Sequence, residues 1–181
     1  MNNTPFDLTP VLTGALVRAR PLVADDFMAL AAAASDPLLW AQHPDPERWR
    51  PDVFRRNVFD GALECGSAFT IIDLATNAVI GTSRYYGWDE STREVSIGYT
   101  FFVRTHWGGR YNGELKQLML DHAFRWADRV WFHIGADNMR SRRAVEKVGA
   151  TFDSVSERDF NGVAVPYAYY VIERHAWENR R

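Results

Sequence analysis

The spacing of apolar residues changes several times along the chain and predicts a mixed α/β domain. Apolar and polar residues alternate over 94–103, which predicts a strand, whereas the apolar residues after position 114 repeat at helical spacing. The expected strands are 16–20, 68–74, 79–86, 94–103, 129–136, 151–158 and 165–174, and the expected helices are 25–36, 52–63, 114–126 and 138–148. This order predicts a central twisted mixed sheet flanked by helices.

Turn and capping residues separate these elements without marking a second domain. Thr76-Asn77 and Asn161-Gly162 each predict the turn of a hairpin. Asn138 is expected to cap a helix that Gly149 ends. Residues 1–15 are expected to form an N-terminal arm that is loose over its first ten residues, so that residues 16–181 make up a single domain.

Composition limits the class of protein. The chain has 181 residues, of which 46% are hydrophobic and 24% charged, values typical of a soluble globular protein. Its net charge of −2 argues against general attraction to nucleic acid or to an anionic membrane. Cys65 is the single cysteine, so no internal disulfide forms, and the five histidines lack metal-ligand spacing. Without an evident signal peptide or membrane-spanning stretch, we expect a cytoplasmic protein that uses no metal.

The loop at 106–113 is the first candidate site. It joins an expected strand to an expected helix and contains Gly108 and Gly109. Free N–H groups and the helix dipole attract anions at such a junction, and glycines let the backbone approach a phosphate. The loop has no lysine and lacks three correctly spaced glycines, so it is neither a P-loop nor a dinucleotide-binding fingerprint. By itself the glycine pair is equally consistent with a tight turn that binds nothing.

Two longer motifs carry a resemblance to a known family. The pyrophosphate-binding signature of the GNAT N-acetyltransferases resembles segment 99–124, whose core is Trp107-Gly108-Gly109-Arg110-Tyr111-Asn112-Gly113-Glu114. That family's next motif is similar to segment 137–150, in which an asparagine opens a helix that ends in Glu-Lys-Val-Gly. The resemblance covers roughly 16–174, and the Asn-Met-Arg-Ser-Arg-Arg-Ala form is most similar to the branch that contains ribosomal-protein N-terminal acetyltransferases.

The resemblance implies a fold with splayed strands, and it implies which residues would bind each part of the cofactor. Acetyl-CoA would be the co-substrate, and an amine would attack it directly in a ternary complex. Backbone groups of Phe102, Val103 and Arg104 would pair with the pantetheine arm. Asn138 and Ser141 would lie beside the pantetheine and the thioester, although Asn138 is also explained as a plain helix cap. The N–H groups that would hold the pyrophosphate belong to Gly108, Gly109, Arg110, Tyr111, Asn112 and Gly113.

The chain departs from the family pattern at three positions. Thr105 stands where glutamine or arginine is usual, and Arg110 stands where glycine or alanine is usual. Arg110 would be strained by about 1 kcal/mol if its φ were positive. We hypothesise that its guanidinium grips a phosphate and replaces lost loop contacts. Val145 occupies the place of a tyrosine that many relatives use as an acid, which leaves Ser141 as the substitute. Three tyrosines near the last strand are alternatives: Tyr167, Tyr169 and Tyr170.

The required base depends on the acceptor. Deprotonating a protein α-amine at pH 7 costs about 1.2 kcal/mol, whereas a lysine side chain costs about 4.6 kcal/mol. Glu94 is the candidate base, acting through water, because it begins the strand that enters the loop. The alternative is a solvent-facing glutamate beside Arg93. The basic stripe of Arg140, Arg143 and Lys147 is expected to be a solvated face that could meet a 3′-phosphate.

Two functions therefore follow from the sequence. The leading one is an N-acetyltransferase that acts on a protein N-terminus or a small-molecule amine. The alternative is a non-catalytic module that binds or senses acyl-CoA on the same fold, motivated by the altered loop and by Val145. Antibiotic or polyamine modification would differ in the acceptor alone and would need an acidic cleft. The oligomeric state stays open, with a homodimer as one alternative.

Overall fold

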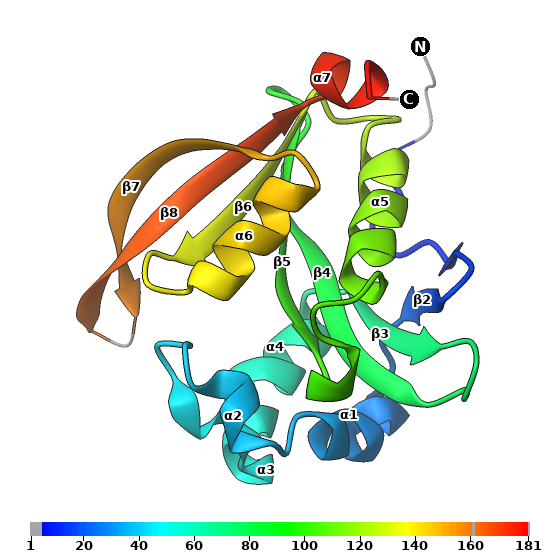
Figure 1. Ribbon diagram of the computed structural model, residues 1–181, viewed down its shortest axis with the longest axis vertical. Helices are drawn as coiled ribbons and strands as arrows, with labels where there is room; N and C mark the ends of the chain where they lie inside the picture. Colours follow the sequence, from blue (N-terminus) through cyan, green and yellow to red (C-terminus); the bar gives the residue numbers. More distant parts are fainter. Residues whose placement is uncertain (1–4, 161, 181) are drawn as a thin grey trace.

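An eight-stranded sheet runs through the molecule, and the computed structural model describes residues 5–160 and 162–180 (Figure 1). The strand order is β1-β2-β3-β4-β5-β6-β8-β7, and all neighbours are antiparallel except the parallel pair β5 and β6. The strands are β1 Leu12–Thr13, β2 Val17–Pro21, β3 Ala68–Asp73, β4 Val79–Asp89, β5 Glu94–Phe102, β6 Arg129–Gly135, β7 Thr151–Phe160 and β8 Val163–Glu173.

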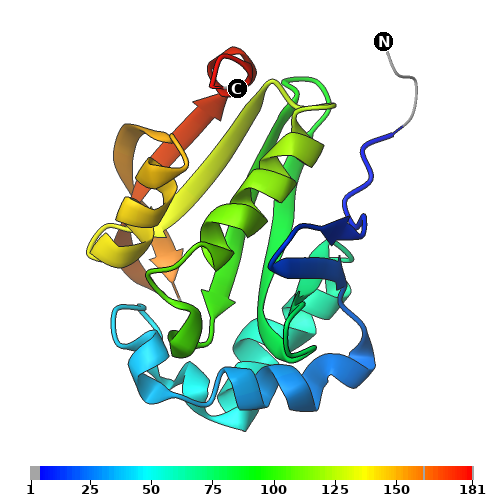
Figure 2. The same cartoon turned by 45° about the vertical axis from the view of Figure 1, so that its right-hand side comes forward.

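Two groups of helices cover the sheet (Figure 2). Helices α5 (Tyr111–Ala123) and α6 (Met139–Lys147) pack on one face over a large apolar core. The second group encloses a smaller core around Trp40, Phe54 and Phe101. It consists of α1 (Phe27–Ala33), α2 (Pro37–Trp40), α3 (Pro51–Phe54), a π-helical turn at Arg55–Phe59 and α4 (Asp60–Glu64). Helix α7 (Arg174–Glu178) follows the last long strand.

The sheet opens between its two parallel strands. Their pairing runs only from Glu94 opposite Arg129 to Ser96 opposite Trp131, and beyond it β5 and β6 diverge (Figure 1). Strand β5 is also irregular, because Tyr99 has a left-handed φ of 52° and the register with β4 shifts nearby. A bulge of this kind bends a strand and re-aims its backbone. The splayed strands that the family resemblance implied are therefore present.

The N-terminal segment is fixed to the core, so its predicted looseness is wrong for the described residues from 5 onward. The Phe6 ring lies 5.0 Å from that of Trp88 and 5.2 Å from that of Trp126, measured between centroids. The Asp7 carbonyl oxygen is 2.7 Å from Nε2 of His122. One large aromatic side chain buries enough apolar surface to anchor a polar segment.

Most predicted elements are present with shifted ends. The expected helix at 52–63 is a continuous run from α3 to α4 through the π-helical turn. The expected loop at 40–51 holds a 3₁₀ turn at Pro46–Trp49. The sequence did not indicate β1, α2 or α7, which are all short. Asn77 has a φ of 58°, in keeping with the predicted turn, whereas Asn161 lies outside the described residues.

Candidate active site

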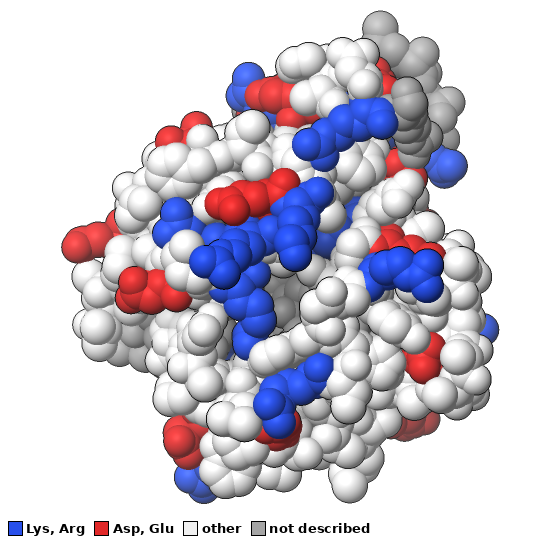
Figure 3. Space-filling model, viewed as in Figure 1, with Lys and Arg blue, Asp and Glu red and all other residues white. Residues whose placement is uncertain are grey.

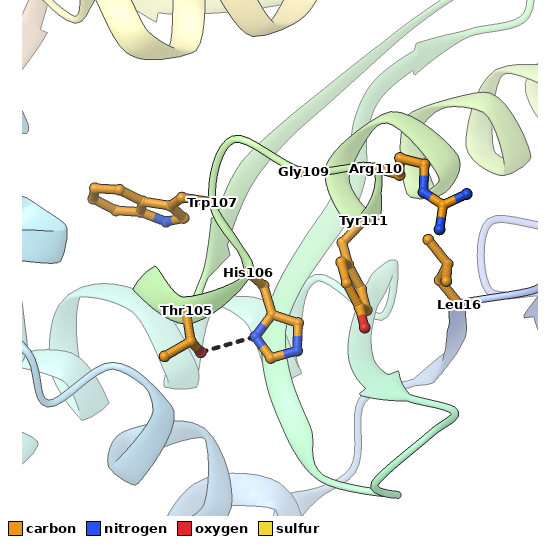
Figure 4. A pocket seen from close by; sticks show the side chains of 7 residues that line it. All are labelled: Leu16, Thr105, His106, Trp107, Gly109, Arg110 and Tyr111. Atoms are coloured by element: carbon orange, nitrogen blue, oxygen red, sulfur yellow. Dashed lines mark hydrogen bonds between the residues drawn. The ribbon is translucent and has the colours of Figure 1, made fainter.

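A cavity of about 270 Å³ lies where β5 ends and α5 begins (Figure 4). A 3₁₀ turn at Arg104–His106 carries the chain out of the sheet, and the glycine loop returns it to α5. The Thr105 hydroxyl is 3.0 Å from Nδ1 of His106 in the cavity wall. The lining residues are Leu16, Thr105, His106, Trp107, Gly109, Arg110 and Tyr111.

The backbone of this loop is open to a ligand. Gly108 has a φ of 68°, a conformation that favours glycine. A Cβ added at Gly108 or Gly113 would meet no described heavy atom within 4 Å. The first N–H groups of α5 lack partners inside the helix, and the helix dipole adds partial positive charge there. The site therefore fits an anion such as a pyrophosphate.

Arg110 fits the loop without strain. Its φ of −80° and ψ of −16° are those of a right-handed helix, so the strain considered for a positive φ does not arise. Its side chain lines the cavity beside Leu16 (Figure 4).

Arg110→Ala is expected to weaken acetyl-CoA binding about tenfold, because a charge-assisted contact to a phosphate is lost. Isothermal titration measures this, and dephospho-CoA serves as the matched ligand because it lacks the 3′-phosphate. The same loss with both ligands places the contact on the pyrophosphate. Unchanged affinity of both ligands would contradict the role assigned to Arg110.

Glu114 fixes the far wall of the cavity. Its carboxylate accepts hydrogen bonds from the backbone N–H groups of Ala15, Leu16 and Val17 at 2.8 to 2.9 Å. A Cβ added at Gly14 would lie 2.5 Å from the Glu114 carboxyl carbon, so glycine is required for this approach. The first turn of α5 thereby holds β2, and with it Leu16, beside the loop.

Trp107 closes the mouth of the opening between β5 and β6. Its indole Nε1 donates to the Phe102 carbonyl at 2.8 Å, and the Arg140 guanidinium lies 3.8 Å from its ring centroid. The Val103 N–H donates to Ile80 in β4, and the Arg104 side chain pairs with Asp36. Arg140 is half-buried and also donates to the Leu39 carbonyl, so it is not part of a solvated stripe as predicted.

Helix α6 lies on the other side of the opening. The Asn138 side chain caps it by accepting from the Ser141 N–H at 3.2 Å, as the sequence predicted. Val145 is buried in the core. Arg142 donates to the Tyr170 hydroxyl, which donates to Glu146, so this network is occupied in holding α6 on β8. Tyr170 is therefore committed to structure.

Glu94 lies far from the loop. Its carboxylate accepts from Nη1 of Arg129 and from Nε1 of Trp131, each at 3.0 Å, at the paired end of β5 and β6. Eight residues of extended strand separate it from Phe102, which corresponds to about 26 Å. The structure does not bring this predicted base to the cavity, because a strand carries its two ends to opposite edges of the sheet.

Lys116 is a buried residue that the sequence reasoning missed. It projects from α5, is 4% exposed, and donates from Nζ to the Thr100 hydroxyl at 2.8 Å. Burial lowers the pKa of its ammonium group to about 7. The signal in the sequence was its spacing, since Met119 and Leu120 follow it by three and four residues on the buried face of the helix.

The opposite face of the sheet carries aromatic and basic groups near the same opening. The Tyr86 hydroxyl is 3.0 Å from Nδ1 of His133, and Arg158 lies over the Tyr167 ring. Burial and the nearby Arg158 charge lower the pKa of His133 to about 4. Arg48 is buried against Asp45. Sequence reasoning named Tyr167 alone among these residues as a candidate.

Comparison with protein families decides the identity of the fold. Residues 17–151 match the model described as the acetyltransferase (GNAT) domain. The chain belongs to the GNAT acetyltransferase family. It is therefore an acyltransferase.

Solved GNAT structures share the fold over nearly the whole chain. A GCN5-related N-acetyltransferase from Brucella melitensis has a TM-score of 0.85 at 19% identity, covering 98% of this chain and 86% of that one. The spermidine N-acetyltransferase from Vibrio cholerae, solved with CoA and spermine, has a TM-score of 0.70 at 15% identity and covers 92% and 100%. A proposed ribosomal-protein-serine acetyltransferase from Vibrio cholerae has 0.72 at 13%, covering 91% and 99%. No curated protein matches the chain.

The surface beside the loop that precedes α5 is basic (Figure 3). Lysine and arginine side chains gather around a hollow between α6 and the loop that precedes α5 (Figure 3). Helix α6 contributes four basic residues, namely Arg140, Arg142, Arg143 and Lys147. Positive charge at this mouth suits an anionic acyl-CoA. No described helix is long and apolar enough to cross a membrane.

Proposed function

We propose that this GNAT enzyme transfers an acetyl group from acetyl-CoA to a primary amine that attacks it directly in a ternary complex. One observation carries the proposal: the open anion-binding loop follows the part of β5 that has diverged from β6. Acetyl-CoA supplies a thioester as the acyl donor. The N–H groups from Gly108 to Gly113 would hold its pyrophosphate. The exposed basic side chains of Arg143 and Lys147 on α6 would be available to the 3′-phosphate.

The pantetheine arm would run from the loop along the edge of β5 that faces β6. Because the Val103 N–H points to β4, the Phe102 carbonyl points into the opening, where Trp107 now donates to it. Pairing of the arm with Phe102 therefore requires the Trp107 indole to leave that carbonyl. The acyl end would then lie deeper in the opening, toward Thr100 and the first turn of α6, where Ser141 lies.

The acceptor would approach from the opposite face of the sheet. That face presents the Tyr86–His133 pair and Tyr167 together with Arg158, and the Asp45 carboxylate is already bonded to Arg48 and Asn57. Such a surface repels a polycation and accepts aromatic, neutral or anionic groups. We therefore propose a monoamine acceptor with an α-amine, such as a protein N-terminus. Its deprotonation at pH 7 costs about 1.2 kcal/mol, so the reaction does not require Glu94 as a base close to the amine.

Release of free thiol from acetyl-CoA with a panel of amines tests this proposal. We expect turnover with peptides that carry a free N-terminus and much less with spermidine. Gly109→Trp places an indole in the cavity at a position without positive φ, where an added Cβ comes no nearer than 4.0 Å to its neighbours. It should lower kcat/KM for acetyl-CoA at least tenfold, about 1.4 kcal/mol of lost contact.

Gly61→Trp is the matched control, since an added Cβ there also meets no described heavy atom within 4 Å and Gly61 lies in α4, outside the cavity. It should retain full turnover. Tight acetyl-CoA binding without thiol release for any amine would favour the alternative, a non-catalytic acyl-CoA-binding module. Absence of binding even at millimolar acetyl-CoA would overturn the proposal altogether.

A further inference from the structure

Lys116 is a buried amine that the fold does not otherwise use. At 4% exposure its hydrogen-bond partner is the Thr100 hydroxyl, which is itself 2.7 Å from the Ser83 hydroxyl. Within residues 5–160 and 162–180, no carboxylate forms an ion pair with it. Lysine is rarely buried without a paired charge, because removing an ammonium group from water is costly.

Nζ of Lys116 lies where the two strands β5 and β6 diverge. Thr100 belongs to β5 and lies four residues beyond Ser96, where the pairing with β6 ends. The ring of Phe132, the next residue of β6 after the last pair, has its centroid 5.6 Å from Nζ. The amine therefore lies in the opening between the strands, on the α5 side, deeper than Phe102 and the loop.

The surroundings of Nζ are uncharged on every element that packs against it. Thr100 and Ser83 offer hydroxyl groups from β5 and β4, and Phe132 offers a ring face from β6. From α5 itself, the neighbouring core residues Leu115, Met119 and Leu120 are apolar. Burial alone lowers the pKa of Lys116, with no contribution from another charge. Such an amine exchanges a proton readily near neutral pH.

We propose that Lys116 donates a proton to the sulfur that leaves acetyl-CoA; this assignment rests on the proposed function. The acceptor nitrogen forms a bond to the carbonyl carbon, the C–S bond breaks, and its electron pair goes to sulfur. The Lys116 ammonium group gives one proton to that sulfur and becomes a neutral amine. The attacking nitrogen releases its proton to water, and water returns one proton to Lys116.

The acidities of the two groups suit this transfer. A thiol has a pKa of about 8.5, and a lysine with a pKa of about 7 is the stronger acid, so the proton moves downhill to the thiolate. An ordinary lysine, with a pKa of about 10.4, would not give up its proton so readily. Val145 offers no hydroxyl, and we assign to Lys116 on α5 the donor role that the sequence had suggested for Ser141 on α6.

The binding affinities of CoA and of desulfo-CoA, which lacks the sulfur, test the contact between Lys116 and the sulfur without turnover. At pH 8 the unsubstituted protein should bind CoA about tenfold more tightly than desulfo-CoA, because the neutral amine of Lys116 accepts a hydrogen bond from the thiol. Lys116→Met should bind both ligands with the affinity that the unsubstituted protein has for desulfo-CoA. Gln117→Met, at the exposed position of α5 next to Lys116, is the control and should keep the tenfold difference. Equal losses for both ligands in Lys116→Met would overturn the proposal.

Kinetics supply the second measurement. Lys116→Met should lower kcat by about a hundredfold, with little change in KM for acetyl-CoA, and should abolish the fall of kcat above pH 7. An unchanged pH profile, or an acetyl group found on Lys116 by mass spectrometry, would overturn the donor role. Failure of the proposed function is recognised separately, because the unsubstituted enzyme would then release no thiol while the binding comparison could still be made.

Discussion

Lys116→Met is expected to raise the free energy of unfolding at pH 7 by about 4 kcal/mol. Burial lowers the pKa of Lys116 from 10.5 to about 7, and each pKa unit corresponds to about 1.4 kcal/mol, which gives about 5 kcal/mol. Loss of the hydrogen bond to Thr100 offsets about 1 kcal/mol of this gain. Methionine has a similar length and no charge to desolvate, so it fills the same space.

The pH dependence distinguishes this cause from better packing. Between pH 7 and 10.5 the unfolded chain binds one more proton at this site than the folded chain, so the stability of the unsubstituted protein rises with pH. Below pH 7 both states are protonated and the cost of burying the ammonium group is constant. At pH 10 the pKa contribution falls to about 0.8 kcal/mol, and the lost hydrogen bond offsets it, so the advantage of Lys116→Met should disappear.

Urea unfolding at pH 7 and pH 10 measures both values, with Lys147→Met as the control for removal of a lysine charge. An equal gain at the two pH values would assign the effect to packing. A loss of stability at pH 7 would mean that contacts of the ammonium group outweigh its desolvation.

Glu114→Ala is expected to lower the free energy of unfolding by about 3 kcal/mol, the second large effect. The carboxylate accepts from three consecutive backbone N–H groups, and their partly buried donors would be left without partners. Because these bonds hold Leu16 against the cavity, acetyl-CoA affinity should fall as well. Glu114→Gln keeps one acceptor oxygen and should lose about half as much.

Urea unfolding and isothermal titration on the same samples measure the two effects of Glu114. Glu90→Ala, at an exposed glutamate in the turn after β4, controls for loss of a negative charge. A destabilised Glu114→Ala that keeps full acetyl-CoA affinity would show that the position of Leu16 is unimportant for binding.

The main strands and helices could be predicted because one face of each is buried. Val95 and Ile97 alternate with polar positions along β5, and Leu115, Met119 and Leu120 repeat along α5, both in the same core. The short elements α2 and α7 could not be predicted, since four or five residues are too few for a period to be visible. The anchoring of the N-terminal segment depends on the Phe6 ring and on a contact between the Asp7 carbonyl and His122, and neither forms a periodic pattern.

The candidate site likewise contains features that the sequence could predict and features that it could not. Local features such as the Asn138 cap and the open glycine loop depend on neighbouring residues, and the sequence predicted them. The distance of Glu94 from the loop could not be predicted, because its neighbours do not reveal which edge of the sheet it reaches. Lys116 was overlooked because its hydropathy suggests a surface residue, whereas its burial depends on Thr100 and Phe132 in two other elements.

The short pairing between β5 and β6 has a mechanical consequence. Three residue pairs join the leaf formed by strands β1 to β5 to the leaf formed by β6, β8 and β7. The line through these pairs is the natural hinge of the molecule, and the free ends of the two strands lie far from it. A molecule bound between the leaves would contact both of them, and the shared apolar core would oppose any change in the angle between them.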